Sequence, residues 1–378
     1  MKYQFYNEDQ EGLIKMIRDF GEKEVKPFQA EWDDKGIFPR EAIEKAFELG
    51  FHVLDVPEQY GGPGLDYLTT MMCVEELNRS CTAIAPTVVG ASIAAKIVDI
   101  AGTEEQKTYF YDLLLNGAFS GMCITEPNAG SDAASMRCMA VKDGDEYVLN
   151  GSKCFASNGG ISDVMIIFAV TDKDAGSHGI SCFMVETNRP GCIIGKEENK
   201  LGFRCANTVP ITFEDCRIPA KNLIGVENEG FKITMQTLDK GRVKVGASAL
   251  GYAQAAIDYA TDYAKVREQF GKPICKFQGI QFMLADMEAQ TEAARQLVYY
   301  AARLIDEGKP ATRAASMAKL IATDNAMKVC TDAVQIFGGY GLCKDYPVEQ
   351  LFRDAKVLQI VEGTNQIQRM IIGRDMCR

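Results

Sequence analysis

The sequence predicts a mainly helical α+β protein with three domains. Its 378 residues are enough for two or three domains at roughly 100–200 residues each. Helical periodicity gives way to short β-rich runs near residue 119, and long helical stretches return after Gly225. We therefore expect an N-terminal helical domain at 1–118, a central β-domain at 119–224 and a C-terminal four-helix bundle at 225–378.

The first domain shows a buried helical stripe among charged residues. Its apolar residues recur at spacings of about three to five positions, as one buried face of a helix requires. They are Leu13, Ile14, Ile17, Phe20 and Val25. A further helix is expected at 41–49, ended by Gly50. Thr103 with Gln106 forms a capping box, which predicts that a helix begins there.

The central segment has the composition of strands and tight turns. Apolar β-rich runs occur at 164–170 and 180–185. Clusters of Gly, Asn, Asp and Pro separate such runs, at 142–145, 158–160 and 188–191. No helical period is sustained here, so the segment predicts a sandwich or a barrel.

The last segment is rich in Ala, Leu, Met, Lys and Gln, with few helix breakers. Helices are expected over 231–267, 280–307, 311–337 and 346–358. Four helices with short connections favour an antiparallel bundle.

Charge and rare residue types exclude several functions. Lys plus Arg number 41 and Asp plus Glu 52, so the net charge is −11. This balance predicts no nucleic-acid partner and no binding to anionic membranes, although one local basic pocket is compatible with it. Only His52 and His178 are present, which argues against a metal centre.

The cysteines and the absence of sorting segments point to the cytoplasm. The 13 cysteines include no CxxC pair and are odd in number, which is typical of reduced thiols. No membrane-spanning run and no leader is visible, so we expect no membrane insertion and a bacterial cytoplasmic enzyme. The phosphate loop of NTPases, the Rossmann GxGxxG and the GxSxG nucleophile elbow are all absent.

Two motifs near the centre have polar atoms suited to a flat cofactor. Thr125–Asp132 packs turn formers, hydroxyls and carboxylates together, which could hold a polar heterocycle or form an ordinary domain-boundary turn. Lys153–Gly159 is a strand that ends in a turn and places Phe155 and Ser157 on one face. The alternative is a core aromatic residue with an incidental serine.

Two later motifs carry charge. Arg267 and Lys272 end a long helix, where they could meet a phosphate or complement the helix C-terminus. Glu362 follows the largely apolar run 357–361 in a break between helices. Desolvation there would raise its pKa from about 4.3 towards roughly 6–7, which suits a general base. The alternative is a capping carboxylate of the last helix.

These segments, in this order, resemble the acyl-CoA dehydrogenase family of flavoproteins over essentially the whole chain. The blocks that carry the resemblance are Thr125–Asp132, Lys153–Gly159, Arg267–Gly271 with Gln278, Gln335–Gly341 and Glu362–Arg369. The resemblance implies a homotetramer that holds FAD between the β-domain and the bundle, with part of each cofactor site supplied by a neighbouring subunit.

The resemblance also assigns roles to individual residues. Contacts to the FAD of the same subunit fall on Met122, Ile124, Thr125, Gly130, Ser131, Phe155, Ala156 and Ser157, and contacts to a neighbour's FAD on Arg267, Gln278, Gln335, Gly338 and Gly339. Further cofactor contacts are expected from Thr364 and Gln366, and acyl-CoA contacts from Ser131, Asp239, Arg242 and Gly363. Glu362 matches the catalytic base, and no metal is expected.

The implied reaction is α,β-dehydrogenation of a short- or medium-chain acyl-CoA, or the reverse enoyl-CoA reduction. Glu362 would take the α-proton while flavin N5 takes the hydride, and an electron-transferring flavoprotein would accept the electrons. Asp239 and Arg242, three apart on one helix face, would serve the CoA tail, or form an ion pair on a solvated surface. Alternatives are an acyl-CoA oxidase and a catalytically silent CoA-binding helical assembly.

The chain departs from the family pattern at three places. Phe155-Ala156-Ser157 stands where Trp-Ile-Thr is common, and Val361 stands where the residue before the base is often Tyr. Some family members carry the base on the helix, at the position of Gly241, and its absence there favours Glu362.

Overall fold

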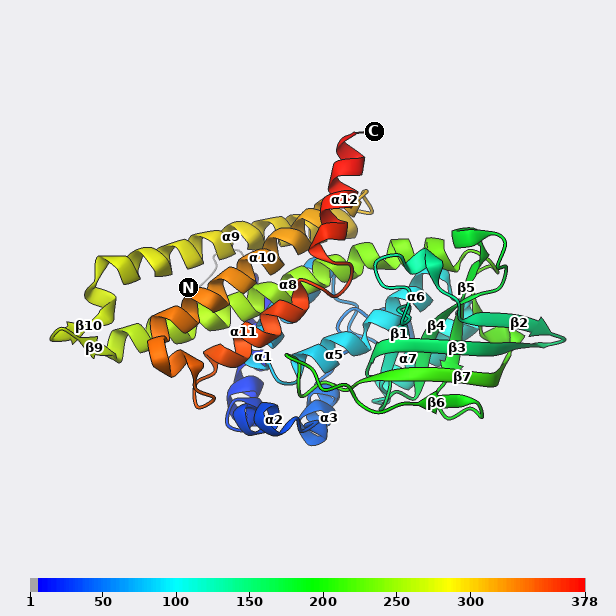
Figure 1. Ribbon diagram of the computed structural model, residues 1–378, viewed down its shortest axis with the longest axis horizontal. Coiled ribbons are helices and arrows are strands. Elements are labelled where there is room, and N and C mark those ends of the chain that lie inside the picture. Colours follow the sequence, from blue (N-terminus) through cyan, green and yellow to red (C-terminus); the bar gives the residue numbers. More distant parts are fainter. Residues whose placement is uncertain (1–5, 378) are drawn as a thin grey trace.

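The computed structural model describes residues 6–377 and shows a β-rich end and a longer helical end (Figure 1). The N-terminal helices are α1 Glu8–Phe20, α2 Gln29–Lys35, α3 Arg40–Glu48, α4 Tyr67–Ser80, α5 Ala85–Ala91, α6 Ile93–Ala101 and α7 Glu104–Leu115, with a π-helical turn at Gly21–Val25. The expected helix at 41–49 and the capping box of Thr103 with Gln106 are both confirmed.

The central domain is one mixed sheet. Its strands are β1 Ser120–Cys123, β2 Met139–Asp143, β3 Glu146–Ser157, β4 Val164–Val170, β5 Ile180–Glu186, β6 Cys192–Ile194, β7 Thr208–Pro219 and β8 Leu223–Ile224. The order is β6-β7-β3-β2-β4-β5-β8, and β1 pairs parallel with β4.

The sheet differs from the expected sandwich or barrel because it has one path with two ends, at β6 and β8. Alternate residues of β4 explain how a single sheet is buried on both faces. Ile166 and Phe168 pack with the helices of residues 94–114, while Met165 and Ile167 pack with Leu149 and other residues of the sheet's other face.

The C-terminal domain contains α8 Gly230–Val266, α9 Gln278–Asp306, α10 Thr312–Phe337, α11 Val348–Leu358 and α12 Asn365–Met376. A short hairpin of β9 Glu268–Gln269 and β10 Lys272–Pro273 joins α8 to α9. The four expected helices are confirmed, and α12 follows them. At 1.5 Å per residue the 37 residues of α8 span about 55 Å, which is why α8 reaches from the β-domain to the far end of the bundle (Figure 1).

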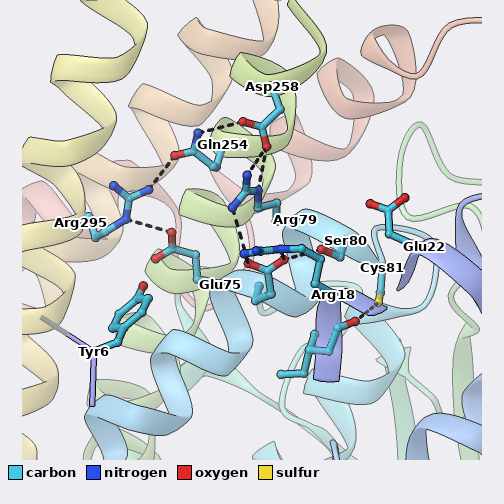
Figure 2. A network of polar contacts seen from close by, with 12 residues as sticks. Tyr6, Arg18, Glu22, Glu75, Arg79, Ser80, Cys81, Gln254, Asp258 and Arg295 are labelled. Atoms are coloured by element: carbon cyan, nitrogen blue, oxygen red, sulfur yellow. Dashed lines mark hydrogen bonds and ion pairs between the residues drawn. The ribbon is translucent and has the colours of Figure 1, made fainter. Parts of the chain in front are cut away.

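A polar network joins the N-terminal helices to the bundle (Figure 2). Glu75 of α4 accepts a hydrogen bond of 2.9 Å from Arg295 of α9, which is 1% exposed and also donates to Gln254 of α8. The helices approach closely at Gly251, where a Cβ would lie 2.3 Å from the backbone oxygen of Glu75. Across residues 6–377, no helix is long and apolar enough to cross a membrane.

Candidate active site

Glu362 lies in the turn between α11 and α12. Its φ is +53°, an uncommon conformation for a residue with a side chain. The turn is closed by Asn365, whose backbone N–H donates to Gln359 O at 3.1 Å, and by Gln368, whose amide donates to Gly363 O at 2.8 Å. Thr364 caps α12, so the expected break between helices is confirmed and the capping role belongs to Thr364 rather than to Glu362.

The carboxylate of Glu362 is buried beside three cations. Burial raises its pKa, and Arg242, Lys319 and Lys244 each lower it, in decreasing order. Within the described residues its Oε2 has no hydrogen-bond partner. A buried carboxylate oxygen without a hydrogen-bond partner costs free energy of folding. A proton taken from a bound molecule would give this oxygen a partner.

Helix α8 passes directly beneath this carboxylate. A Cβ built on Gly241 would lie 2.7 Å from Glu362 Oε2, so a glycine is what allows the helix to come this close. One residue on, Arg242 is 4% exposed and donates to Asp239 Oδ1 at 2.7 Å. The ion pair considered from the sequence therefore exists, but Arg242 is buried beside the base and not on a solvated surface.

The two central motifs, Thr125–Asp132 and Lys153–Gly159, lie against each other. Cys154 N–H donates to Thr125 O at 2.9 Å, and Lys153, fully buried, forms a 2.8 Å ion pair with Glu126. Glu126 also accepts the backbone N–H groups of Arg137 and Cys138. This buried pair fixes the 125–132 turn against the end of β3, a role that the sequence interpretation did not assign.

The end of β3 presents an aromatic ring and a hydroxyl outward. Phe155 is 63% exposed with φ +56°, at an irregularity in the pairing with β7. Ala156 is buried and Ser157 is exposed. Phe155 is therefore not a core residue. Its exposed ring beside Ser157, and the polar 125–132 turn held next to both, fit a flat heterocycle such as a flavin.

The other expected cofactor residues lie at the far end of the bundle. A pocket of about 660 Å³ is lined by Arg267, Gly338, Gly339 and aromatic side chains, among them Phe277 and Tyr340. The guanidinium of Arg267 lies 5.5 Å from the ring centre of Tyr340. Gln278 and Gln335 are exposed nearby, at the start of α9 and the end of α10.

One chain does not bring all of these residues together. Gly230 of α8 packs against Ser181 of β5, and Gly241 lies roughly 16 Å further along the helix at 1.5 Å per residue. Arg267 ends the same helix about 39 Å beyond Gly241. The two groups of expected cofactor residues therefore lie far apart within one chain.

Fold and site together define a class of protein: an oxidoreductase in which a helical bundle, joined to a β-domain, carries a glutamate with a buried carboxylate oxygen. Models of the acyl-CoA dehydrogenase N-terminal, middle and C-terminal domains match residues 7–118, 121–216 and 228–377. The chain belongs to the acyl-CoA dehydrogenase family.

Relatives over the whole length agree with this membership. The chain is 47% identical to the short-chain specific acyl-CoA dehydrogenase of Megasphaera elsdenii, over 98% of both chains. It is 45% identical to the acryloyl-CoA reductase (NADH) of Anaerotignum propionicum, over 98% of this chain and 95% of that one.

Solved structures are equally similar. The butyryl-CoA dehydrogenase of Megasphaera elsdenii has a TM-score of 0.97 at 46% identity, with all of both chains covered. A chain in a structure described as the electron transferring flavoprotein of Acidaminococcus fermentans has a TM-score of 0.97 at 47% identity, also over all of both chains.

The family, the fold class and the oxidoreductase activity expected from the sequence are thus confirmed, and FAD is the cofactor of this family. The roles of individual site residues stay predictions. Sequence reasoning missed Lys319 and Lys244, whose charges act on Glu362 from α10 and α8. Only their charge within largely apolar helical stretches could have drawn attention to them.

Proposed function

We propose that the protein is an FAD-dependent dehydrogenase of short-chain acyl-CoA thioesters, or runs the same reaction as an enoyl-CoA reductase. The observation that carries the proposal is the Glu362 carboxylate, buried with Oε2 unpartnered among the described residues, directly over Gly241 of α8. Relatives named short-chain acyl-CoA dehydrogenase and acryloyl-CoA reductase support both directions.

The proposed chemistry begins with the acidic α-proton of a thioester. Glu362 would accept that proton, and its raised pKa brings it closer to the working pH than an exposed glutamate. FAD, when bound, would supply the acceptor for the hydride from the β-carbon. Phe155 and Ser157 would lie against the ring system, while Asp239 and Arg242 would contact the acyl-CoA.

Several features would keep water from the reacting atoms. Helix α8 packs against Glu362 at the buried Gly241, and α10 contributes Lys319, which is fully buried. Excluding water strengthens the interaction of fixed dipoles with charge that develops on the thioester oxygen. The backbone N–H groups of the 362–364 turn would be the donors that this chain contributes.

A homotetramer would complete the cofactor site. Arg267 lies about 39 Å along α8 from Gly241 and lines one pocket with Gly338 and Gly339, so these three residues would serve the FAD of a neighbouring copy. Electrons would pass to an electron-transferring flavoprotein, as the likeness to a chain in such a structure supports. The 13 cysteines, all free thiols in residues 6–377, support a reducing cytoplasmic location.

The test is anaerobic bleaching of the bound flavin by butyryl-CoA and by a panel of longer and branched acyl-CoA thioesters. The Glu362→Gln variant should keep its flavin absorbance and lose on the order of 10³-fold in turnover, as removal of a general base requires. Glu11→Gln, at an exposed glutamate of α1, is the matched control.

Two results would end the proposal: a purified protein without flavin, or a Glu362→Gln variant that bleaches at the parent rate. Rapid peroxide formation in air would instead assign the protein to the acyl-CoA oxidases, with oxygen as the electron acceptor.

A further inference from the structure

Lys319 is a buried lysine in the middle of α10. Its exposed fraction is 0%, and Nζ donates a 2.7 Å hydrogen bond to Asn365 Oδ1. Over residues 6–377, no carboxylate lies within ion-pair distance of this Nζ. A buried ammonium without an ion-pair partner costs several kcal/mol of desolvation, so its presence in the core calls for a compensating role.

The partner of Lys319 belongs to the turn that carries the catalytic base. Asn365 is 3% exposed and starts α12, three positions after Glu362. Its amide Nδ2 donates to Thr323 Oγ1 at 2.9 Å and to Asp324 Oδ1 at 2.6 Å. Its backbone N–H closes the turn onto Gln359. The hydrogen bonds of α10 therefore hold the turn through Asn365, and Gln359 adds a 2.8 Å bond from its Nε2 to Asp324 Oδ1.

The cations around Glu362 come from two helices. From α8, Arg242 is already paired with Asp239, and Lys244 donates to Ser92 at 2.7 Å. From α10, Lys319 makes the second-largest contribution among the three cations that lower the pKa of Glu362.

The other titratable neighbours are Tyr67 and Asp324. Tyr67 of α4 interacts with Glu362 and is neutral, since burial raises its pKa well above 10.0. Asp324 of α10 favours the charged form of Lys319, and Arg242 opposes it. Lys319 is thus the one of these three cations that comes from α10 rather than from α8.

We infer that Lys319 is a positioning residue for the catalytic base: through Asn365 it holds the turn of Glu362, and its ammonium keeps the Glu362 carboxylate ionised. The inference rests on the proposed role of Glu362 as the base. It assigns a function to a buried side chain that does not itself contact the acyl group or the flavin.

Burial of Lys319 and Glu362 determines how the effect of Lys319 on Glu362 changes with pH. Burial lowers the pKa of Lys319 to about 7 and raises that of Glu362. Below about pH 7 the ammonium is present and opposes protonation of Glu362. Above that pH, Lys319 is increasingly neutral and this effect fades.

The experiment compares the pH profiles of kcat/KM, from pH 5.5 to 9, for the parent holoenzyme and the Lys319→Met and Lys319→Arg variants. Methionine fills the space of the lysine stem without charge, whereas arginine retains the charge. We expect Lys319→Met to lose about tenfold more activity at pH 6 than at pH 8, because its acid limb moves to higher pH. Lys319→Arg should keep the parent's acid limb.

Controls separate this role from simple structural support. Lys15→Met, at an exposed lysine of α1, should match the parent at every pH. Flavin absorbance and the melting temperature report folding, and Lys319→Gln replaces methionine if that variant does not fold. An acid limb in the neutral variants that coincides with the parent's, or a loss equal at all pH values that arginine does not rescue, would overturn the inference.

The result also distinguishes this inference from the proposed function. If the parent oxidises no acyl-CoA and bleaches with none, the proposed function fails. If the parent is active and its pH profile is insensitive to Lys319, only the positioning role fails.

Discussion

A single methyl group at Gly241 should disable the site while it leaves the fold intact. The Cβ of Gly241→Ala would lie 2.7 Å from Glu362 Oε2 and 3.4 Å from Cδ. Ordinary contact begins near 3.4 Å, so the carboxylate oxygen must move by about 0.7 Å. The oxygen is the end of a rotatable side chain, and moving it requires no change in the backbone of α8.

The expected effect is a loss of roughly 10²-fold in kcat, which corresponds to about 2.7 kcal/mol of transition-state stabilisation. Stability should stay the same or rise slightly, because alanine in a helix is favoured over glycine by up to about 1 kcal/mol. The assay is steady-state turnover together with thermal denaturation and flavin absorbance of the same preparation.

Two other glycines give matched controls. Gly12→Ala in α1 meets no atom within 4 Å and should leave both turnover and stability near the parent values. Gly251→Ala would place a Cβ 2.3 Å from the backbone oxygen of Glu75 and should lower stability instead. A Gly241→Ala protein with parental kcat, or one that loses stability in proportion to activity, would refute the reasoning.

Further predictions concern buried charges. Glu75→Ala leaves Arg295 without its buried carboxylate and should lower the free energy of unfolding by about 3 kcal/mol in denaturant titrations. Lys153→Met removes the ion pair to Glu126 and should lower the flavin content of the purified protein, measured by absorbance. The pKa of Glu362 is raised on folding, so stability falls as pH rises through that value. Glu362→Gln should therefore raise the melting temperature more at pH 8 than at pH 5.

The helices were predictable because their signals are local. The capping box at Thr103 and the apolar stripe around Ile14 and Ile17 are set by residues within a few positions of each other, and both occur in the structure. The sheet order was not predictable, since β3 pairs with β7, more than fifty residues later. A run such as 164–170 indicates burial on both faces but does not say which strands lie beside it.

Within the site, the residues that could be predicted were again those marked by their immediate sequence neighbours. Glu362 stands out because it interrupts an apolar run at a helix break, and desolvation does raise its pKa. Phe155 was open to two interpretations, because alternation along a strand gives its face but not whether that face is covered. The structure leaves it 63% exposed because the chain bulges there with φ +56°.

The set of cations around Glu362, which would let it act as a base, could not be predicted from the sequence. An acid buried on its own would hold its proton, and such a group could not serve as a base near neutral pH. The cations that oppose this come from Arg242, Lys244 and Lys319, which lie 43 to 120 positions earlier in the chain. Each of them is itself costly to bury, and each becomes less costly when Glu362 is charged. Glu362 and its cations thus support one another only after α8, α10 and the 359–365 turn have packed together, so the ionisation of the proposed base depends on the assembled bundle.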